Sequence, residues 1–117
     1  MGIKSYRELR VWKKGVELVK DTYELTEKFP RQELYGLVSQ MRRAAVSIPS
    51  NIAEGFRRYH NKEYKQFLYM AAGSCAELET QLTIAKELKY IKGNEETDFL
   101  EKPDHIGRMI SSLIKKL

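Results

Sequence analysis

The sequence predicts an all-α protein of a single domain, residues 1–117, folded as an antiparallel up-down-up-down four-helix bundle. Three observations lead to this class. Apolar residues recur at steps of three and four along most of the chain, which places them on one face of a helix. No segment alternates apolar and polar residues with the two-residue period of a strand. The connections between the periodic segments are short, and short connections make successive helices antiparallel neighbours.

The first helix is expected over residues 6–28, where two neighbouring apolar stripes run along one side. The stripe at the a and d heptad positions consists of Leu9, Trp12, Val16, Val19, Tyr23 and Thr26. The adjacent stripe consists of Val11, Gly15, Leu18, Thr22, Leu25 and Phe29. A bundle helix needs an apolar arc of only about three heptad positions in seven, and this arc is wider. The extra width predicts a second partner surface, on a neighbouring helix or a neighbouring subunit. Pro30 ends the helix, because a proline disfavours the helical conformation of the residue before it.

The second helix, expected over residues 33–58, carries one apolar and one polar stripe. The apolar stripe consists of Leu34, Leu37, Met41, Ala45, Ile48, Ile52 and Phe56. Pro49 lies within it, and a kink is expected there because proline removes a backbone donor and clashes with the preceding turn. The polar stripe has short residues at its centre, so another backbone would be able to come close. It consists of Gln40, Arg43, Ser47, Ser50, Glu54 and Arg58.

The third helix is expected from an N-cap at Asn61 to about Tyr90. Residues 71–76 are all small, and Gly73 among them costs a helix about 1 kcal/mol relative to alanine. That cost predicts that Gly73 packs closely against the small residues 44–47 of the second helix.

The fourth helix has an apolar stripe that a proline interrupts. The stripe consists of Phe99, Leu100, Ile106, Ile110, Leu113, Ile114 and Leu117. Pro103 predicts a short first turn from residue 95, a kink or restart, and then a firm helix over residues 104–116.

The charge balance favours an acidic partner. The net charge is +5 and the isoelectric point is near 9.3. Nucleic acid is the foremost such partner, although +5 is also an ordinary solubility charge for a domain of this size. The sequence contains no run of about 18 apolar residues, so no membrane span is expected. The N-terminus lacks the apolar core of a signal peptide. The single cysteine excludes an internal disulfide and fits a reducing compartment. A cytoplasmic protein with no membrane partner is therefore expected.

The residues that carry most enzyme chemistry are not grouped in this sequence. His60 and His105 have no histidine, cysteine or carboxylate at metal-ligand spacing beside them. Cys75 lies on an apolar face without a neighbouring base, and no glycine-rich phosphate loop is present. The sequence therefore predicts no enzymatic activity, no cofactor, no metal and no small-molecule substrate.

Six polar residues of the second and third helices are expected to form a structural network or a subunit interface. They are Arg42, Arg43, Asn51, Glu54, Glu77 and Gln81. Such a network would fix the register of the helices. The alternative is that the same residues form a ligand site.

A basic-aromatic cluster between the second and third helices is the candidate nucleic-acid interface. Its binding residues are Arg57, Arg58, His60, Lys62 and Lys65, and Tyr59 or His60 would stack on a base. Antiparallel packing brings two more basic sets to the same end, Arg7, Arg10, Lys13 and Lys14 at the start of the first helix and Lys115 and Lys116 at the end of the fourth. RNA or DNA binding without sequence specificity is expected, because phosphate contacts need only a basic patch. The alternatives are a protein-protein interaction adaptor with no nucleic-acid binding, or a solvated helix junction.

Four motifs also carry a family resemblance. Residues 40–55 read Gln-x-Arg-Arg-Ala-Ala-x-Ser-Ile-x-x-Asn-Ile-Ala-Glu-Gly, and further matches lie at Val11-Trp12, at residues 29–37 and at residues 67–82. This pattern resembles the bacterial four-helix-bundle family of 23S rRNA intervening-sequence proteins. The resemblance implies a bundle that assembles into a closed homopentamer. It extends to a related group, the accessory proteins of diversity-generating retroelements, which are basic pentameric barrels that work with a reverse transcriptase and nucleic acid.

Overall fold

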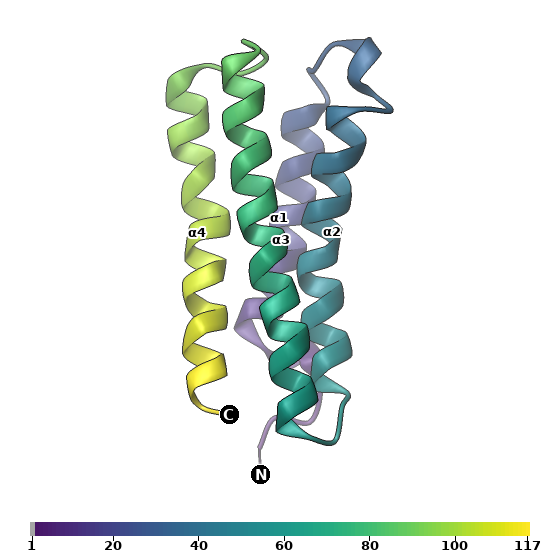
Figure 1. The fold of residues 1–117 in the computed structure, drawn as a ribbon, viewed down its shortest axis with the longest axis vertical. Coiled ribbons are helices and arrows are strands. Elements are labelled where there is room, and N and C mark those ends of the chain that lie inside the picture. The colour runs from purple at the N-terminus through teal and green to yellow at the C-terminus, as the bar shows by residue number, and fades with distance from the viewer. Residues whose placement is uncertain (1) are drawn as a thin grey trace.

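The computed structural model describes residues 2–117 and contains four long α-helices that lie side by side (Figure 1). They are α1 (Arg10–Thr26), α2 (Leu37–Phe56), α3 (Asn61–Glu87) and α4 (Gly93–Lys115). Two short 3-10 helices, η1 (Tyr6–Glu8) and η2 (Arg31–Glu33), precede α1 and α2. No strand occurs within residues 2–117, so the predicted all-α bundle class is confirmed. None of the helices in this range is both long and apolar enough to cross a bilayer.

The helices pack in a ring in chain order. Each helix contacts the next and α4 returns to α1, whereas no Cα atoms of the diagonal pairs come within 8 Å in residues 2–117. Contacts at the two ends join connections that are far apart in sequence. The Tyr90 hydroxyl donates to the Glu33 carboxylate over 2.7 Å at one end. At the other end the Asn61 amide nitrogen lies 3.5 Å from the Leu117 carbonyl oxygen, close to both chain termini (Figure 1).

The core lies mainly between α2 and α3. Met41, Ile48 and Ile52 of α2 and Leu68, Leu78 and Leu82 of α3 are fully buried. Burial of each such side chain stabilises the fold by about 1.5–3 kcal/mol relative to exposure. The predicted apolar stripe of α2 is therefore buried from Leu37 to Ile52. Phe56 at its end is half-buried, and Leu34, which precedes the helix, is exposed.

The face that α1 buries differs from the predicted a and d stripe. Val11, Gly15, Leu18 and Thr22 face the core, whereas Val16 is 44% exposed and Tyr23 is 43% exposed. The reason is the size of Gly15. A Cβ atom on Gly15 would lie 3.2 Å from the Cβ of Pro49, so the stripe that contains the glycine allows the closest approach to α2. Thr22 is tolerated inside because its hydroxyl donates to the Leu18 carbonyl oxygen over 2.7 Å.

Both internal prolines lie inside continuous helices. α4 runs through Pro103 as one helix, so the predicted short first turn and restart are wrong, and a kink there stays a prediction. α2 likewise continues through Pro49, and the kink expected there stays a prediction. Both rings are buried, and this burial offsets the single backbone hydrogen bond that each proline removes.

The predicted close packing at Gly73 is also wrong. A Cβ atom there would meet nothing within 4 Å, because Gly73 is on the exposed side of α3. Ser74, one residue and about 100° further round the helix, is the residue that faces α2. The predicted cap at Asn61 is not formed either: His60 is the N-cap residue of α3, and the Asn61 side chain lies beside Leu117 instead.

Candidate nucleic-acid interface

Positive charge is concentrated at the end of the bundle that holds both termini. Three segments meet there, residues 2–14, 57–65 and 108–117 (Figure 1). They contain 12 of the 21 Lys and Arg residues but only two of the 16 Asp and Glu residues. These segments, called the basic end below, therefore carry a net charge of +10. Because the whole chain carries +5, the remaining residues carry −5.

Aromatic rings hold two arginines at the basic end. The Arg57 guanidinium lies 5.5 Å from the centroid of the Tyr6 ring. Arg7 lies 5.5 Å from the same ring and 5.3 Å from that of Trp12, and the two rings meet edge to face. The η1 turn thus brings the first basic set against the end of α2. The aromatic partners were not among the predicted site residues, although Tyr6 and Trp12 each stand next to a basic residue in the sequence.

Arg58 is held on the other side of α2. Its guanidinium lies 4.8 Å from the centroid of the Phe67 ring and 3.2 Å from the Glu54 carboxylate. Glu54, predicted to belong to the polar network, is therefore the ion-pair partner of a basic-end residue. Cation-π contacts at exposed sites contribute about 0.5–1 kcal/mol each, enough to restrict these side chains without burying their charge.

The other predicted binding residues are distributed around the same end. His60, Lys62, Arg10 and Lys13 are exposed, while Lys65 and Lys14 are half-buried. Lys14 is placed differently from the rest. It lies 4.0 Å from Glu17 and lines a groove between α1 and α4 with Glu101 and His105, away from the Arg57 cluster.

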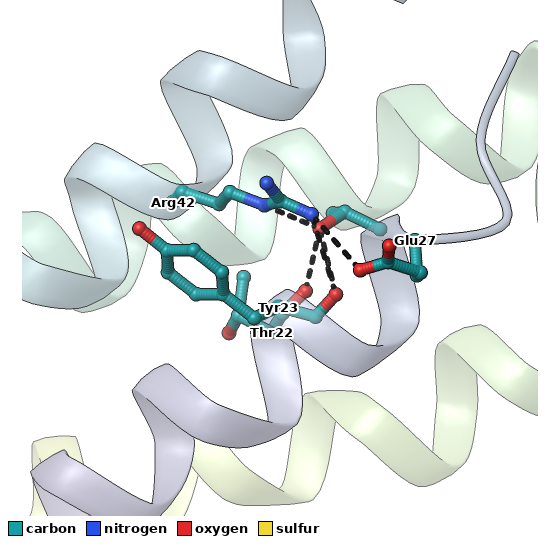
Figure 2. A network of polar contacts seen from close by, with 5 residues as sticks. Thr22, Tyr23, Glu27 and Arg42 are labelled. Carbon is teal, nitrogen blue, oxygen red and sulfur yellow. Dashed lines mark hydrogen bonds and ion pairs between the residues drawn. The ribbon is translucent and has the colours of Figure 1, made fainter. Parts of the chain in front are cut away.

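The six predicted network residues lie in separate places. Arg42 forms the largest cluster, at the C-terminal end of α1 (Figure 2). The Arg42 Nε donates to Thr26 Oγ1 over 2.9 Å. Its Nη2 lies 3.4 Å from the Tyr23 carbonyl oxygen and 3.6 Å from the Glu27 carboxylate. The guanidinium also lies 4.3 Å from the centroid of the Tyr23 ring. A cation there also complements the negative end of the α1 dipole. Arg42 therefore fastens α2 to α1.

A second cluster joins α2 to α3. The Asn51 side-chain amide donates to the carbonyl and hydroxyl oxygens of Ser47, both over 2.9 Å. The Ser74 hydroxyl in turn donates to the Ser47 hydroxyl over 2.9 Å. Gln81 is only 5% exposed, and its Oε1 atom accepts no hydrogen bond from residues 2–117. Arg43 of α2 and Glu77 of α3 are both exposed.

The model of the 23S rRNA-intervening sequence protein family matches residues 7–112. This chain belongs to that family. The match confirms the resemblance seen in the sequence motifs, while the relation to retroelement accessory proteins stays a prediction.

A solved structure shares the fold of this intervening-sequence protein. It is a protein of unknown function from the S23 ribosomal protein family of Bacteroides thetaiotaomicron, and it superposes with a TM-score of 0.80. The two sequences are 21% identical, and the superposition covers 90% of this chain and 98% of the other. The likeness shows that the two proteins share a fold. No functionally curated protein matches this chain.

Two apolar faces of this family member remain exposed. The first, called the α1–α2 face, holds Val16 and Tyr23 of α1 and Val46 of α2, and Leu34 and Tyr35 extend it at the end away from the basic end. The second, called the α3 face, holds Tyr69, Met70, Ile84 and Leu88. The α1–α2 face contains side chains of α1 and α2, whereas the α3 face consists of α3 side chains alone.

Cys75 is buried in the core. Burial raises the pKa of the Cys75 thiol to about 12, which leaves almost no thiolate at neutral pH. Among residues 2–117, no three His, Cys, Asp or Glu side chains are grouped as metal ligands would be.

Proposed function

We propose that this chain is a non-enzymatic cytoplasmic protein that binds nucleic acid, or a ribonucleoprotein, without sequence specificity through its basic end. We also propose that it does so as a homo-oligomer, with a pentamer as the leading form. The observation that carries the first proposal is the separation of charge, +10 on the basic end against −5 on the rest of the chain.

A net charge of +5 spread evenly would be an ordinary solubility charge. An excess of positive charge at one end is different, because it creates a local positive potential that attracts a polyanion to that end, although Glu54 pairs with Arg58 and Glu17 lies beside Lys14. Arg57 is already held against a ring, so contact with a phosphate restricts its side chain less than that of a free arginine. Phosphate contacts of this kind give affinity that is independent of sequence.

The test is binding to RNA and DNA across a salt titration, with two charge-matched variants. Removal of Arg57, Arg58 and Lys62 as a triple alanine variant should weaken binding and reduce the slope of log affinity against log salt by about 2–3, since each phosphate contact contributes roughly 0.7–0.9. The control removes three exposed cations far from the basic end, Lys20, Arg31 and Lys92. It should leave the slope close to that of the parent protein.

Equal losses in the two variants would show that only total charge matters and would contradict a site at the basic end. No binding by the parent protein at low salt would overturn the nucleic-acid proposal. The adaptor hypothesis would then be favoured, with an acidic protein as the partner of the basic end.

The oligomer proposal is supported by the two exposed apolar faces. Monomeric proteins rarely leave large contiguous apolar patches in water, and such patches mark interaction sites. Contact between two different faces is heterologous, and it forms a ring when the rotation closes. The number five comes from the family resemblance. The mass of the assembly in solution tests it, and a monomer at micromolar concentration would overturn it.

A further inference from the structure

Tyr59, in the connection between α2 and α3, is 97% exposed. The chain has seven tyrosines, and most of the others use their rings within the fold. Tyr6, Tyr64 and Tyr90 pack against other aromatic rings, and Tyr23 lies against Arg42. The Tyr59 ring gains almost nothing from burial, so it is free for an external ligand.

The surroundings of Tyr59 distinguish it from the other fully exposed tyrosine. Arg57 and Arg58 precede it and Lys62 follows it, whereas Tyr35, which is 93% exposed, lies at the opposite end of α2. α2 has 20 residues, so about 30 Å separates the two positions. The Arg57 guanidinium rests on the Tyr6 ring and that of Arg58 on the Phe67 ring. The cations are thus held at the bundle surface, while the neighbouring ring extends into solvent.

We infer that the preferred ligand of the basic end is a nucleic-acid strand with unpaired bases, on one of which the Tyr59 ring stacks while Arg57, Arg58 and Lys62 neutralise the adjacent phosphates. This inference rests on the proposed function and narrows it from nucleic acid in general to single strands. The two kinds of contact depend differently on the ligand. Phosphates are present in every nucleic acid, so the cations bind single strands and duplexes alike. The faces of paired bases are covered by their neighbours in the stack, so an aromatic side chain reaches them only in an unpaired strand.

The experiment compares the parent protein with three variants, Tyr59→Ala, Tyr59→Phe and Tyr35→Ala. The probes are an unstructured oligo-uridine, an oligo-thymidine and blunt RNA and DNA duplexes of the same length. Loss of one aromatic stacking contact should weaken single-strand binding by about tenfold in Tyr59→Ala. Tyr59→Phe keeps the ring and should bind as the parent does, and Tyr35→Ala, which removes an equally exposed ring, should also be unchanged.

Two further readouts separate stacking from charge. Binding of Tyr59→Ala to the duplexes should equal that of the parent protein, and its salt slope on the single strands should be unchanged, because tyrosine neutralises no phosphate. Helix content by circular dichroism should match in all four proteins, since both positions are exposed.

The possible results distinguish failure of the stacking inference from failure of the proposed nucleic-acid binding. Binding to single strands and duplexes with equal affinity, unaffected by Tyr59→Ala, would overturn the stacking inference and leave the basic-end proposal in place. An equal loss on duplexes in Tyr59→Ala would overturn it as well. No binding to any probe at low salt would overturn both. A tenfold loss confined to single strands would establish the site and show whether it accepts RNA, DNA or both.

Discussion

Gly55 of α2 and Phe67 of α3 approach so closely that a Cβ atom on Gly55 would lie 2.7 Å from the Cβ of Phe67. The same atom would lie 3.0 Å from a ring carbon of Tyr64. Gly55 is thus a point of very close approach between the two helices that flank the basic-aromatic connection. It sets where α2 ends and α3 begins, and so it positions Arg57, Arg58 and Tyr59 at the surface.

Substitution of Gly55 by alanine should therefore destabilise the protein. Alanine is favoured over glycine in a helix interior by about 1 kcal/mol, but at this position the added methyl group forces the two helices apart. Overpacking of this kind costs about 1–3 kcal/mol, so a net loss of up to about 2 kcal/mol is expected in urea unfolding.

Gly107→Ala is the matched control. Gly107 also lies within a helix, and a Cβ atom there would meet nothing within 4 Å. That variant should gain about 0.5–1 kcal/mol from helix propensity alone. If Gly55→Ala were as stable as Gly107→Ala, the close approach of α2 and α3 would not be a constraint on the fold.

Arg42 should contribute more to stability than its neighbour Arg43. Arg42 binds Thr26, the Tyr23 carbonyl oxygen and the Tyr23 ring at the end of α1, whereas Arg43 is exposed. Replacement of Arg42 by alanine should cost about 1–2 kcal/mol, because hydrogen bonds to charged groups are stronger than average and the site is half-buried. Arg43→Ala should stay within about 0.5 kcal/mol of the parent protein. Urea unfolding of the two variants measures the difference, and equal effects would show that the Arg42 cluster does not stabilise the α1–α2 pair.

The sequence predicted the buried face of α2 correctly but not that of α1. The apolar stripe of α2 was predictable because no second stripe competed with it. α1 carries two neighbouring apolar stripes, and periodicity alone does not say which one faces inward. The close contact of Gly15 with Pro49 decided it, and that contact depends on the position of another helix.

The same distinction applies to the candidate site. The sequence predicted that three basic segments meet at one end. In an antiparallel bundle, successive connections alternate between the two ends, so the start of α1, the α2–α3 connection and the end of α4 lie together. The seating of Arg57 on Tyr6 did not follow, since it requires the η1 turn to fold back against α2. The ion pair of Glu54 with Arg58 has i,i+4 spacing and is predictable from sequence. Glu54 was instead assigned to the polar network.

The Glu33–Tyr90 hydrogen bond should make stability depend on pH in the acid range. The Tyr90 hydroxyl and the Leu37 backbone N–H both donate to the Glu33 carboxylate and hold its pKa below the ordinary value of 4.5. A carboxyl whose pKa is depressed by folding stabilises the folded state above its unfolded pKa, and this stabilisation is lost as the pH falls through the folded value. Unfolding free energy should therefore decline below about pH 4.5.

Glu33→Gln and Tyr90→Phe isolate this contribution. Glutamine does not titrate, and phenylalanine removes the strongest donor, so both variants should show a shallower acid decline than the parent protein in urea unfolding from neutral pH downward. Glu101→Gln, a change at an exposed carboxylate on α4, should keep the parental dependence. Identical curves for all four proteins would show that the Glu33–Tyr90 bond does not contribute to acid sensitivity.

The two exposed apolar faces give a test of how subunits associate. Val16→Asp places a charge on the α1–α2 face, and Ile84→Asp places one on the α3 face. Because burial of an unpaired charge in an interface is costly, each variant alone should lose the assembly and appear at a lower mass in solution. Ser111→Asp, an exposed position on α4 outside both faces, should assemble as the parent protein does.

Mixing the two variants distinguishes a heterologous contact from a self-complementary one. In a heterologous assembly each variant retains one intact face, so an intact α3 face on Val16→Asp can bind an intact α1–α2 face on Ile84→Asp. The mixture should then form a one-to-one heterodimer and stop there, because the remaining faces carry the charges. If instead each face bound its own copy, each variant would form a homodimer by itself through its intact face, and mixing would add nothing. In a heterologous ring every subunit points the same way, so the basic ends would gather on one rim and their phosphate contacts would act together.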